Sequence, residues 1–181
     1  MAAGADHLPN FARHAVGSLE TARELDLVLS GLAAEGLDRL SISLTLALER
    51  LLQGGVIGVG PGGPVSSGET TAAFLRRIYD ADWRELGVPA RRGAMLSMTG
   101  PLTEPLLRLR ESPEASIDVL LRAWLPSRFA GDLAEQLDRG RMILWVPVRD
   151  PHEEKLVCET ILGNSRQDVR VHDLPLRRRA R

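Results

Sequence analysis

The chain contains HAVGS at residues 14–18, then an amphipathic helix, then LSISL at residues 40–44. A second copy of this arrangement lies near the other end, where LWVPV at 144–148 precedes a helix capped at Asp150 and the closing stretch VRV at 169–171. Each copy predicts a strand, a helix and a strand. Alternating apolar and polar residues indicate the strands, and apolar residues repeated every three or four positions indicate the helices.

Two βαβ units in one short chain predict an α+β fold, a ferredoxin-like duplicated βαβ sandwich with a long helical insertion between the two repeats. The expected domain plan is a split α+β core over 11–46 plus 141–175, a helical insertion over 47–140 and a basic tail over 176–181. We expect the four core strands to form one antiparallel sheet, with both repeat helices on one face. These strands are expected around residues 11–16, 40–46, 141–149 and 168–172.

The composition is that of an ordinary globular protein, with 44% hydrophobic and 26% charged residues in a chain of 181. The net charge of −1 offers no global field that would attract nucleic acid or an anionic membrane. The single cysteine, Cys158, excludes an intramolecular disulfide and a metal site built from several thiolates. No secretory signal is visible, and every apolar stretch is interrupted before it could span a membrane, so we expect a cytoplasmic protein.

In the first copy, Ser18 is the expected N-cap of the helix and Gly36 is the expected left-handed residue that ends it. Leu40, Ile42 and Leu44 alternate with serine and threonine, which predicts a strand with one face buried. The expected apolar stripe of the helix consists of Ala22, Leu25, Val28, Leu29 and Leu32.

The second copy carries stronger local signals. Asp150 begins a capping box with proline at the first helical position, and Gly163 with Asn164 is expected to end the helix. Pro147 lacks a ladder donor and therefore predicts an edge position or a bulge for its strand. The expected buried stripe consists of Leu156, Val157, Ile161 and Leu162.

The insertion begins with a loop over 54–68 that is rich in glycine, proline and serine. A helix is then predicted from Phe74 to Leu86, closed by the glycine and proline that follow, and a short helix is predicted to open at Thr103. Two more helices are expected, the first from Ser112 with Ile117, Leu120, Leu121, Trp124 and Leu125 on its inner face, the second through Phe129, Leu133 and Leu137 to Gly140.

One glycine-rich motif raises the possibility of a nucleotide site. Gly58, Gly60 and Gly63 fit G-x-G-x-x-G, in which backbone amides meet a pyrophosphate at a helix N-terminus. Pro61 and Pro64 remove amide donors from this loop, and the next helix starts several residues late. A flexible linker is therefore the preferred interpretation, and a small-molecule- or nucleotide-binding protein or enzyme using this loop is the alternative.

The remaining polar candidates do not form a recognisable catalytic or metal-binding pattern. The histidines, His7, His14, His152 and His172, lack metal-ligand spacing. A proton relay between His172 and Asp173 and a carboxylate site at Asp80, Asp82 and Glu85 are both less favoured than ordinary solvated positions. Cys158 is interpreted as a small buried hydrophobe, and Ser66-Ser67 lacks a nucleophile-elbow pattern. We predict no catalytic residue, no metal and no cofactor.

The basic tail contains Arg177, Arg178, Arg179 and Arg181. Such a run could contact phosphates or anionic lipid, but a short run offers few phosphate contacts. We therefore predict no specific binding of nucleic acid and interpret the tail as a solvated charge run.

Several stretches of the chain together match a known pattern: LPSRF at 125–129, LDRGRMILWVPV at 137–148, Asp150 and DVRV at 168–171. With these stretches, the second half of the chain resembles the bacterial heat-induced or general stress protein domain family. VGSLETA at 16–22 resembles that family's opening strand and helix. This resemblance implies a non-enzymatic, stress-linked domain without a known ligand or catalytic residue. It transfers no site residue to this chain.

The sequence therefore predicts a non-catalytic cytoplasmic regulatory or protein-interaction domain that forms a homodimer. The physical basis is the expected sheet, which exposes one face and two edges that need cover or a partner. The expected helical insertion could supply that cover within one chain or between two.

Overall fold

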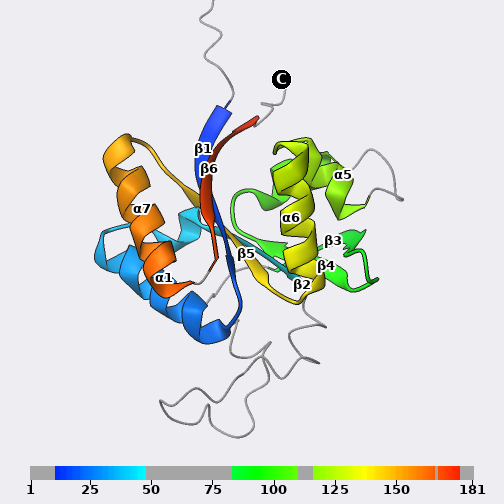
Figure 1. Cartoon of the computed structure of the whole chain (residues 1–181). Helices are drawn as coiled ribbons and strands as arrows, with labels where there is room; N and C mark the ends of the chain where they lie inside the picture. The colour runs from blue at the N-terminus through cyan, green and yellow to red at the C-terminus, as the bar shows by residue number, and fades with distance from the viewer. Residues whose placement is uncertain (1–10, 48–82, 110–115, 166, 176–181) are drawn as a thin grey trace, which may run out of the picture.

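The computed structural model describes residues 11–47, 83–109, 116–165 and 167–175. Within these ranges the fold is α+β, with one six-stranded antiparallel sheet of order β3-β4-β2-β5-β1-β6 (Figure 1). The strands are β1 (Phe11–Leu19), β2 (Ser43–Ala47), β3 (Arg84–Pro89), β4 (Met95–Thr99), β5 (Met142–Pro147) and β6 (Val169–Pro175). The helices are α1 (Ala22–Ala34), the 3-10 turn η1 (Arg39–Ser41), α4 (Thr103–Arg108), α5 (Ile117–Arg122), α6 (Ser127–Asp138) and α7 (Pro151–Asn164).

The four strands predicted for the core all lie in this sheet, where they are neighbours in the order β2-β5-β1-β6. Helices α1 and α7 lie side by side on one face, whereas α5 and α6 lie on the other (Figure 1). Each face carries its own apolar cluster. The cluster beneath α1 and α7 includes Leu25, Leu29, Leu44, Leu144 and Ile161, and the cluster beneath the other helices includes Leu96, Trp124, Phe129, Leu133 and Trp145.

The expectation that β2 has only one buried face is wrong, because both faces of the sheet are covered there. All five residues of β2 are buried. Ser43 Oγ accepts a hydrogen bond from the Leu102 N–H at 3.0 Å, and Thr45 Oγ1 accepts one from the Trp145 indole at 3.1 Å. These bonds satisfy the hydroxyl groups that alternate with the apolar residues, which removes the cost of burying them.

The first helix starts later than predicted. Ser18 belongs to β1, and the N-cap of α1 is Thr21. The Thr21 hydroxyl accepts a hydrogen bond from the Glu24 N–H at 3.1 Å, and the Glu24 carboxylate accepts one from the Thr21 backbone N–H. The predicted end is confirmed, since Gly36 has φ +83°. Leu40 is also misplaced, because it lies in η1 and is 71% exposed.

The start of α7 is confirmed, because the Asp150 carboxylate accepts from the Glu153 N–H at 2.8 Å. Its apolar stripe is confirmed only in part. Val157 and Ile161 are fully buried, but Leu156 is only partly buried and Leu162 is 50% exposed. The helix also includes Gly163 and its following asparagine, which were expected to end it.

The region between the repeats is not purely helical. The helix predicted to end at Leu86 is wrong over its last residues, because Arg84–Pro89 is β3, and Met95–Thr99 forms β4 beside it. This segment forms a strand because its apolar residues alternate with exposed or partly exposed ones, so that Leu86 and Val88 are both buried on one face. Residues 74–82 of that prediction lie outside the described ranges. The helices predicted to open at Thr103 and to run through Phe129 and Leu137 occur as α4 and α6. The helix predicted from Ser112 begins instead at Ile117, as α5, because Ser116 before it is extended. Ser112 itself lies outside the described ranges.

The prediction that Pro147 marks an edge position or a bulge is wrong, because β5 lies between β2 and β1 and its register with β1 is regular. Pro147 is the last residue of β5 and pairs with His14 of β1. On the other side, the pairing with β2 ends two residues earlier, at Ser43 and Trp145. The missing N–H therefore faces the side where the ladder has already ended, and an interior strand tolerates the proline. Within the described helices, none is long and apolar enough to cross a membrane.

Candidate functional site

Several predicted site residues lie outside the described ranges, and nothing in the fold places them. These are the glycines of the nucleotide motif, Gly58, Gly60 and Gly63, together with His7, Ser66, Ser67, Asp80, Asp82 and the arginines at 177–179 and 181. Of the predicted carboxylate group, only Glu85 is described, at an exposed position of β3.

Two of the predicted histidines lie opposite each other. His14 on β1 pairs with His172 on β6, and both face the side of the sheet that carries α6. Burial lowers the pKa of His14, whose Nδ1 lies 3.0 Å from the Ala12 carbonyl oxygen. Burial, aided by the charge of Arg170, also lowers the pKa of His172. Both rings are therefore neutral at neutral pH.

The His172 ring stacks on Phe129 with 4.5 Å between ring centroids. The carboxylate of Asp173 instead accepts a hydrogen bond from Arg13 at 3.3 Å on the opposite face of the strand. Successive side chains of a strand point to opposite faces, which separates the two groups. The pair therefore forms no hydrogen-bonded proton relay among the described residues.

The described residues contain no group of three or more His, Cys, Asp or Glu side chains that could hold a metal ion. Cys158 lies half-buried on α7, and burial raises the pKa of its thiol. A thiol in this environment is a poor nucleophile, because only the thiolate reacts readily.

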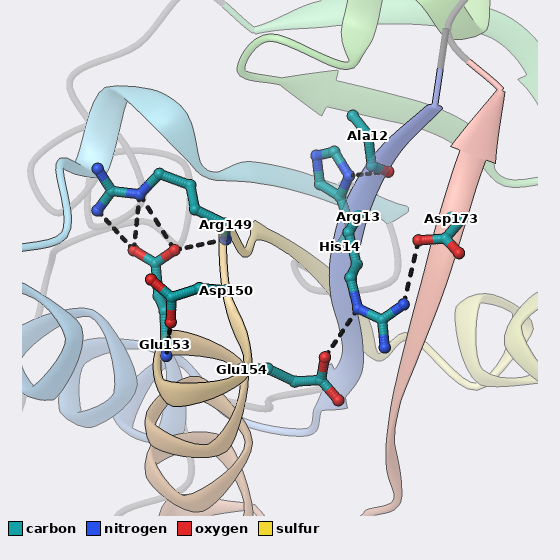
Figure 2. Close-up of polar contacts among 8 residues, drawn as sticks. All are labelled: Ala12, Arg13, His14, Arg149, Asp150, Glu153, Glu154 and Asp173. Carbon is teal, nitrogen blue, oxygen red and sulfur yellow. Dashed lines mark hydrogen bonds and ion pairs between the residues drawn. The ribbon is translucent and has the colours of Figure 1, made fainter. Parts of the chain in front are cut away.

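A group of charged side chains surrounds the start of α7 (Figure 2). Arg149 contacts the Glu153 carboxylate through its guanidinium at 2.6 Å and its backbone N–H at 2.6 Å. The hydrogen bond from Arg149 lowers the pKa of Glu153, and the Glu153 N–H lowers the pKa of the capping Asp150. These contacts complete the cap of α7, and they give the carboxylates of Asp150 and Glu153 hydrogen-bond partners within the protein.

Arg13 connects this helix to the last strand (Figure 2). Its Nε donates to Glu154 of α7 at 2.8 Å, and its Nη1 donates to Asp173 of β6 at 3.3 Å. The hydrogen bond to Glu154 raises the pKa of the Arg13 guanidinium. Because the three side chains are partly exposed, their energetic contribution is small, but together they fix α7, β1 and β6 to one another.

The last strand, β6, lies at the edge of the sheet, and β1 is its only neighbour among the described strands. The direction of its backbone groups follows from one bond, the Val148 N–H to the Arg13 carbonyl at 2.9 Å. The polar backbone groups of successive strand residues point to opposite neighbours, so those of His14 point toward β6. His14 lies opposite His172, whose groups therefore point back toward β1.

The same alternation directs the N–H and C=O groups of Val169, Val171 and Asp173 away from β1. The pairing of β6 with β1 is regular over seven residues, from Val169 to Pro175. This edge therefore presents three consecutive donor–acceptor sets to an added strand. The opposite edge of the sheet is less suitable, because β3 has an irregular register, a glycine at φ +62° and a terminal Pro89.

An open cleft of about 280 Å³ lies at the beginning of β6, on the side of α6. Its lining is Ser18, Phe129, Asp132, Leu133, Glu135, Gln136, Gln167, Asp168 and Arg170. Three of these residues carry carboxylates and one carries a guanidinium. The Arg170 guanidinium lies 5.0 Å from the centre of the Phe129 ring and 3.8 Å from the Asp168 carboxylate. The cleft is therefore polar and acidic, with one aromatic wall.

No family model, curated protein or solved structure matches this chain. The resemblance to the heat-induced or general stress protein domain therefore stays a prediction.

The sequence predicted the strand at 168–172 but neither its position at the edge nor the cleft beside it. Strand order depends on which distant segments pair, and no local pattern encodes that. One signal was present: Arg170 and Asp173 put a charge on each face of the strand, which is typical of an edge.

Proposed function

We propose that this chain is a non-catalytic regulatory or protein-interaction domain that forms a homodimer by pairing β6 with β6 of a second copy. The observation that supports this proposal best is the regular, outward-facing ladder of Val169, Val171 and Asp173. A strand added to such an edge gains main-chain hydrogen bonds without any change in the fold. Two identical edges related by a twofold axis pair antiparallel.

The backbone geometry restricts the register of this pairing. In an antiparallel pair, two directly opposite residues either both point their N–H and C=O groups toward each other or both point them away. A residue whose groups face outward from β6 must therefore lie opposite another outward-facing residue of the second copy. A twofold axis at Val171 pairs Val171 with Val171 of the second copy and Val169 with Asp173. The three residues that pair across the axis in this arrangement, Val169, Val171 and Asp173, each have an N–H to donate.

Neighbouring registers are less favourable. An axis at Arg170 places two arginines opposite each other, and an axis at Asp173 places two aspartates opposite each other, and like charges across a pair are destabilising. An axis at His172 places Pro175, which has no N–H, in the ladder. The register centred on Val171 avoids both defects.

We also propose that the core is a ferredoxin-like duplicated βαβ sandwich. The supporting observation is the strand order β2-β5-β1-β6 within the larger sheet, with α1 and α7 on one face. In that arrangement β3, β4 and the helices α4 to α6 belong to the insertion between the repeats. The insertion then covers the second face of the sheet and leaves the β6 edge as the surface for association.

A cytoplasmic, stress-linked role is part of the same proposal and is supported only by the sequence signals and the family resemblance. It predicts that the level of the protein in its native cell rises after heat exposure. An unchanged level, measured by quantitative mass spectrometry in heated and unheated cultures, would argue against the stress role without affecting the proposed dimer.

The dimer is tested by comparing Val171→Pro with Val171→Thr. Proline removes the outward N–H and leaves the ladder to β1 complete, whereas threonine keeps that N–H on a β-branched side chain. Two symmetric hydrogen bonds are lost per dimer, worth about 1–3 kcal/mol in total. Sedimentation equilibrium should therefore show a dissociation constant roughly five- to hundredfold weaker for Val171→Pro and little change for Val171→Thr. A monomeric parent protein at high concentration would refute the proposal, and thermal melts would verify that both variants fold.

A further inference from the structure

The register centred on Val171 places a histidine and an arginine opposite each other between the two copies. Counting outward from the axis, His172 of each copy lies opposite Arg170 of the second copy. Both side chains contact Phe129 and therefore lie on the face of the sheet that carries α6. Resting on the proposed dimer, we infer that protonation of His172 separates the two copies, so that they associate at neutral pH and dissociate in acid.

The pairing geometry brings these two side chains close together. The backbone groups of Arg170 and His172 point toward β1, so the two residues form a non-hydrogen-bonded pair between the copies. In such a pair the Cα atoms are about 4.5 Å apart and the side chains are closer than in a hydrogen-bonded pair. Like charges directly opposite each other destabilise a sheet. A neutral His172 is therefore compatible with the arginine, and a charged one is not.

The surroundings of His172 also favour charging in the free subunit over charging in the dimer. The ring is half-buried against Phe129, and its Nε2 is buried without a hydrogen-bond partner among the described residues. A charged ring carries an N–H on each nitrogen and needs an acceptor for both. Water at the free edge of β6 can supply one. An added strand excludes part of that water and puts a guanidinium in its place.

The other charged or titratable groups near the ring and Phe129 belong to the same subunit as His172. They are His14 on β1, Asp168, Arg170 and Asp173 on or just before β6, and Asp132 and Glu135 on α6. These groups act on the ring in the free subunit and in the dimer alike. Their effects on dissociation therefore largely cancel.

The second copy adds three groups on this face of the sheet. Its Arg170 lies directly opposite the ring, and its Asp168 and His172 are the diagonal neighbours in this register, at about 7–8 Å. In acid the two diagonal neighbours carry opposite charges, so they offset each other. The sign of the effect is therefore set by the directly opposite Arg170.

The direction of the pH dependence follows from this difference. The free subunit binds a proton at His172 more tightly than the dimer does, so acid favours the free subunit. Burial already lowers the pKa of His172 below 6.5 in the single chain, so dissociation should begin below that pH. General charge effects predict the reverse. The net charge of −1 first approaches zero on acidification, which by itself promotes association.

The experiment compares the full-length parent chain with His172→Gln, which stays neutral, and with Arg170→Glu, which reverses the opposite charge. His152→Gln is the matched control, because His152 is exposed on α7 at the other face of the sheet. Dissociation constants are measured by sedimentation equilibrium at low salt, between about pH 7.5 and pH 5.5, the range in which histidine titrates. Circular dichroism at each pH restricts the comparison to folded protein.

The dissociation constant of the parent should rise on the order of tenfold over this range, because two like-charged pairs form per dimer and each weakens association by about two- to fivefold. His172→Gln should match the parent at the higher pH and change little in acid. His152→Gln should follow the parent throughout. Arg170→Glu should reverse the trend and associate more tightly in acid, because a charged His172 then lies opposite a carboxylate.

The outcomes separate this inference from the proposed function. A parent dissociation constant that does not rise in acid overturns the inference, and so does a rise that persists in His172→Gln. Weaker association of Arg170→Glu in acid overturns the placement of Arg170 opposite His172 and the inference with it. A parent that dimerises near pH 7.5 leaves the proposed function standing in all three cases. A parent that is monomeric at that pH overturns the proposed function itself.

Discussion

Gly100 should be one of the least replaceable residues in the sheet. It has φ +93°, and a Cβ added there would lie 2.3 Å from the carbonyl oxygen of Ile42 and 2.7 Å from the Cα of Ser43. Both atoms belong to backbone at the start of β2, which is held between β4 and β5 and cannot move independently. The close approach occurs where the chain leaves β4 toward α4, so it fixes the insertion against the core.

The expected cost of Gly100→Ala combines two contributions. A positive φ costs a non-glycine residue about 1–2 kcal/mol, and overpacking against fixed backbone adds about 1–3 kcal/mol. Gly36→Ala is the matched control, because Gly36 has φ +83° but no atom lies within 4 Å of its added Cβ. Its cost should be about 1–2 kcal/mol. Urea denaturation, analysed as a two-state transition, measures both values, and an equal loss for the two variants would refute the close contact.

The remaining predictions concern α7 and the buried histidines. Ile161→Ala should lower the free energy of unfolding by about 2–5 kcal/mol because Ile161 is fully buried. Asp150→Ala should lower it by only about 1 kcal/mol, through the lost helix cap. If urea denaturation showed the larger loss for Asp150→Ala, the placement of α7 would be contradicted. His14 and His172 have pKa values lowered from 6.5, so the unfolded chain takes up their protons first as the pH falls. Stability should therefore be greatest above pH 6.5 and decline below it. His14→Gln should reduce that slope in urea titrations over the same range, and an unchanged slope would show that His14 is not buried in its neutral form.

The parts of the fold that were predictable from the sequence are those with a local chemical cause. The cap at Asp150 is formed by a side chain and a backbone N–H three residues apart, and Gly36 ends α1 because it can adopt a positive φ. The doubled strand–helix–strand pattern likewise placed four strands in one sheet. Ser18 was misassigned because a good cap residue also fits a strand, where it pairs with Ile143 of β5.

The parts that could not be predicted depend on which distant segments meet. Leu86 fits both a helical repeat and the alternation of a strand, and only the pairing of its segment with β4 decides between them. The same holds for β6, whose edge position follows from the order of the whole sheet. The cleft requires α6 and the start of β6 to lie together, although Asp132 and Asp168 are far apart in the sequence.

The most direct test of the proposed dimer is disulfide formation at its axis, in a Cys158→Ser background that removes the natural cysteine. Opposite Cα atoms in a hydrogen-bonded antiparallel pair are about 5.5 Å apart, which a disulfide can bridge. Val171→Cys should therefore oxidise to a covalent dimer, detected by intact mass under non-reducing conditions. Val169→Cys should stay monomeric alone and form a mixed disulfide only with Asp173→Cys. Efficient self-crosslinking of Val169→Cys, or none of Val171→Cys, would contradict the pairing of β6 with its own copy.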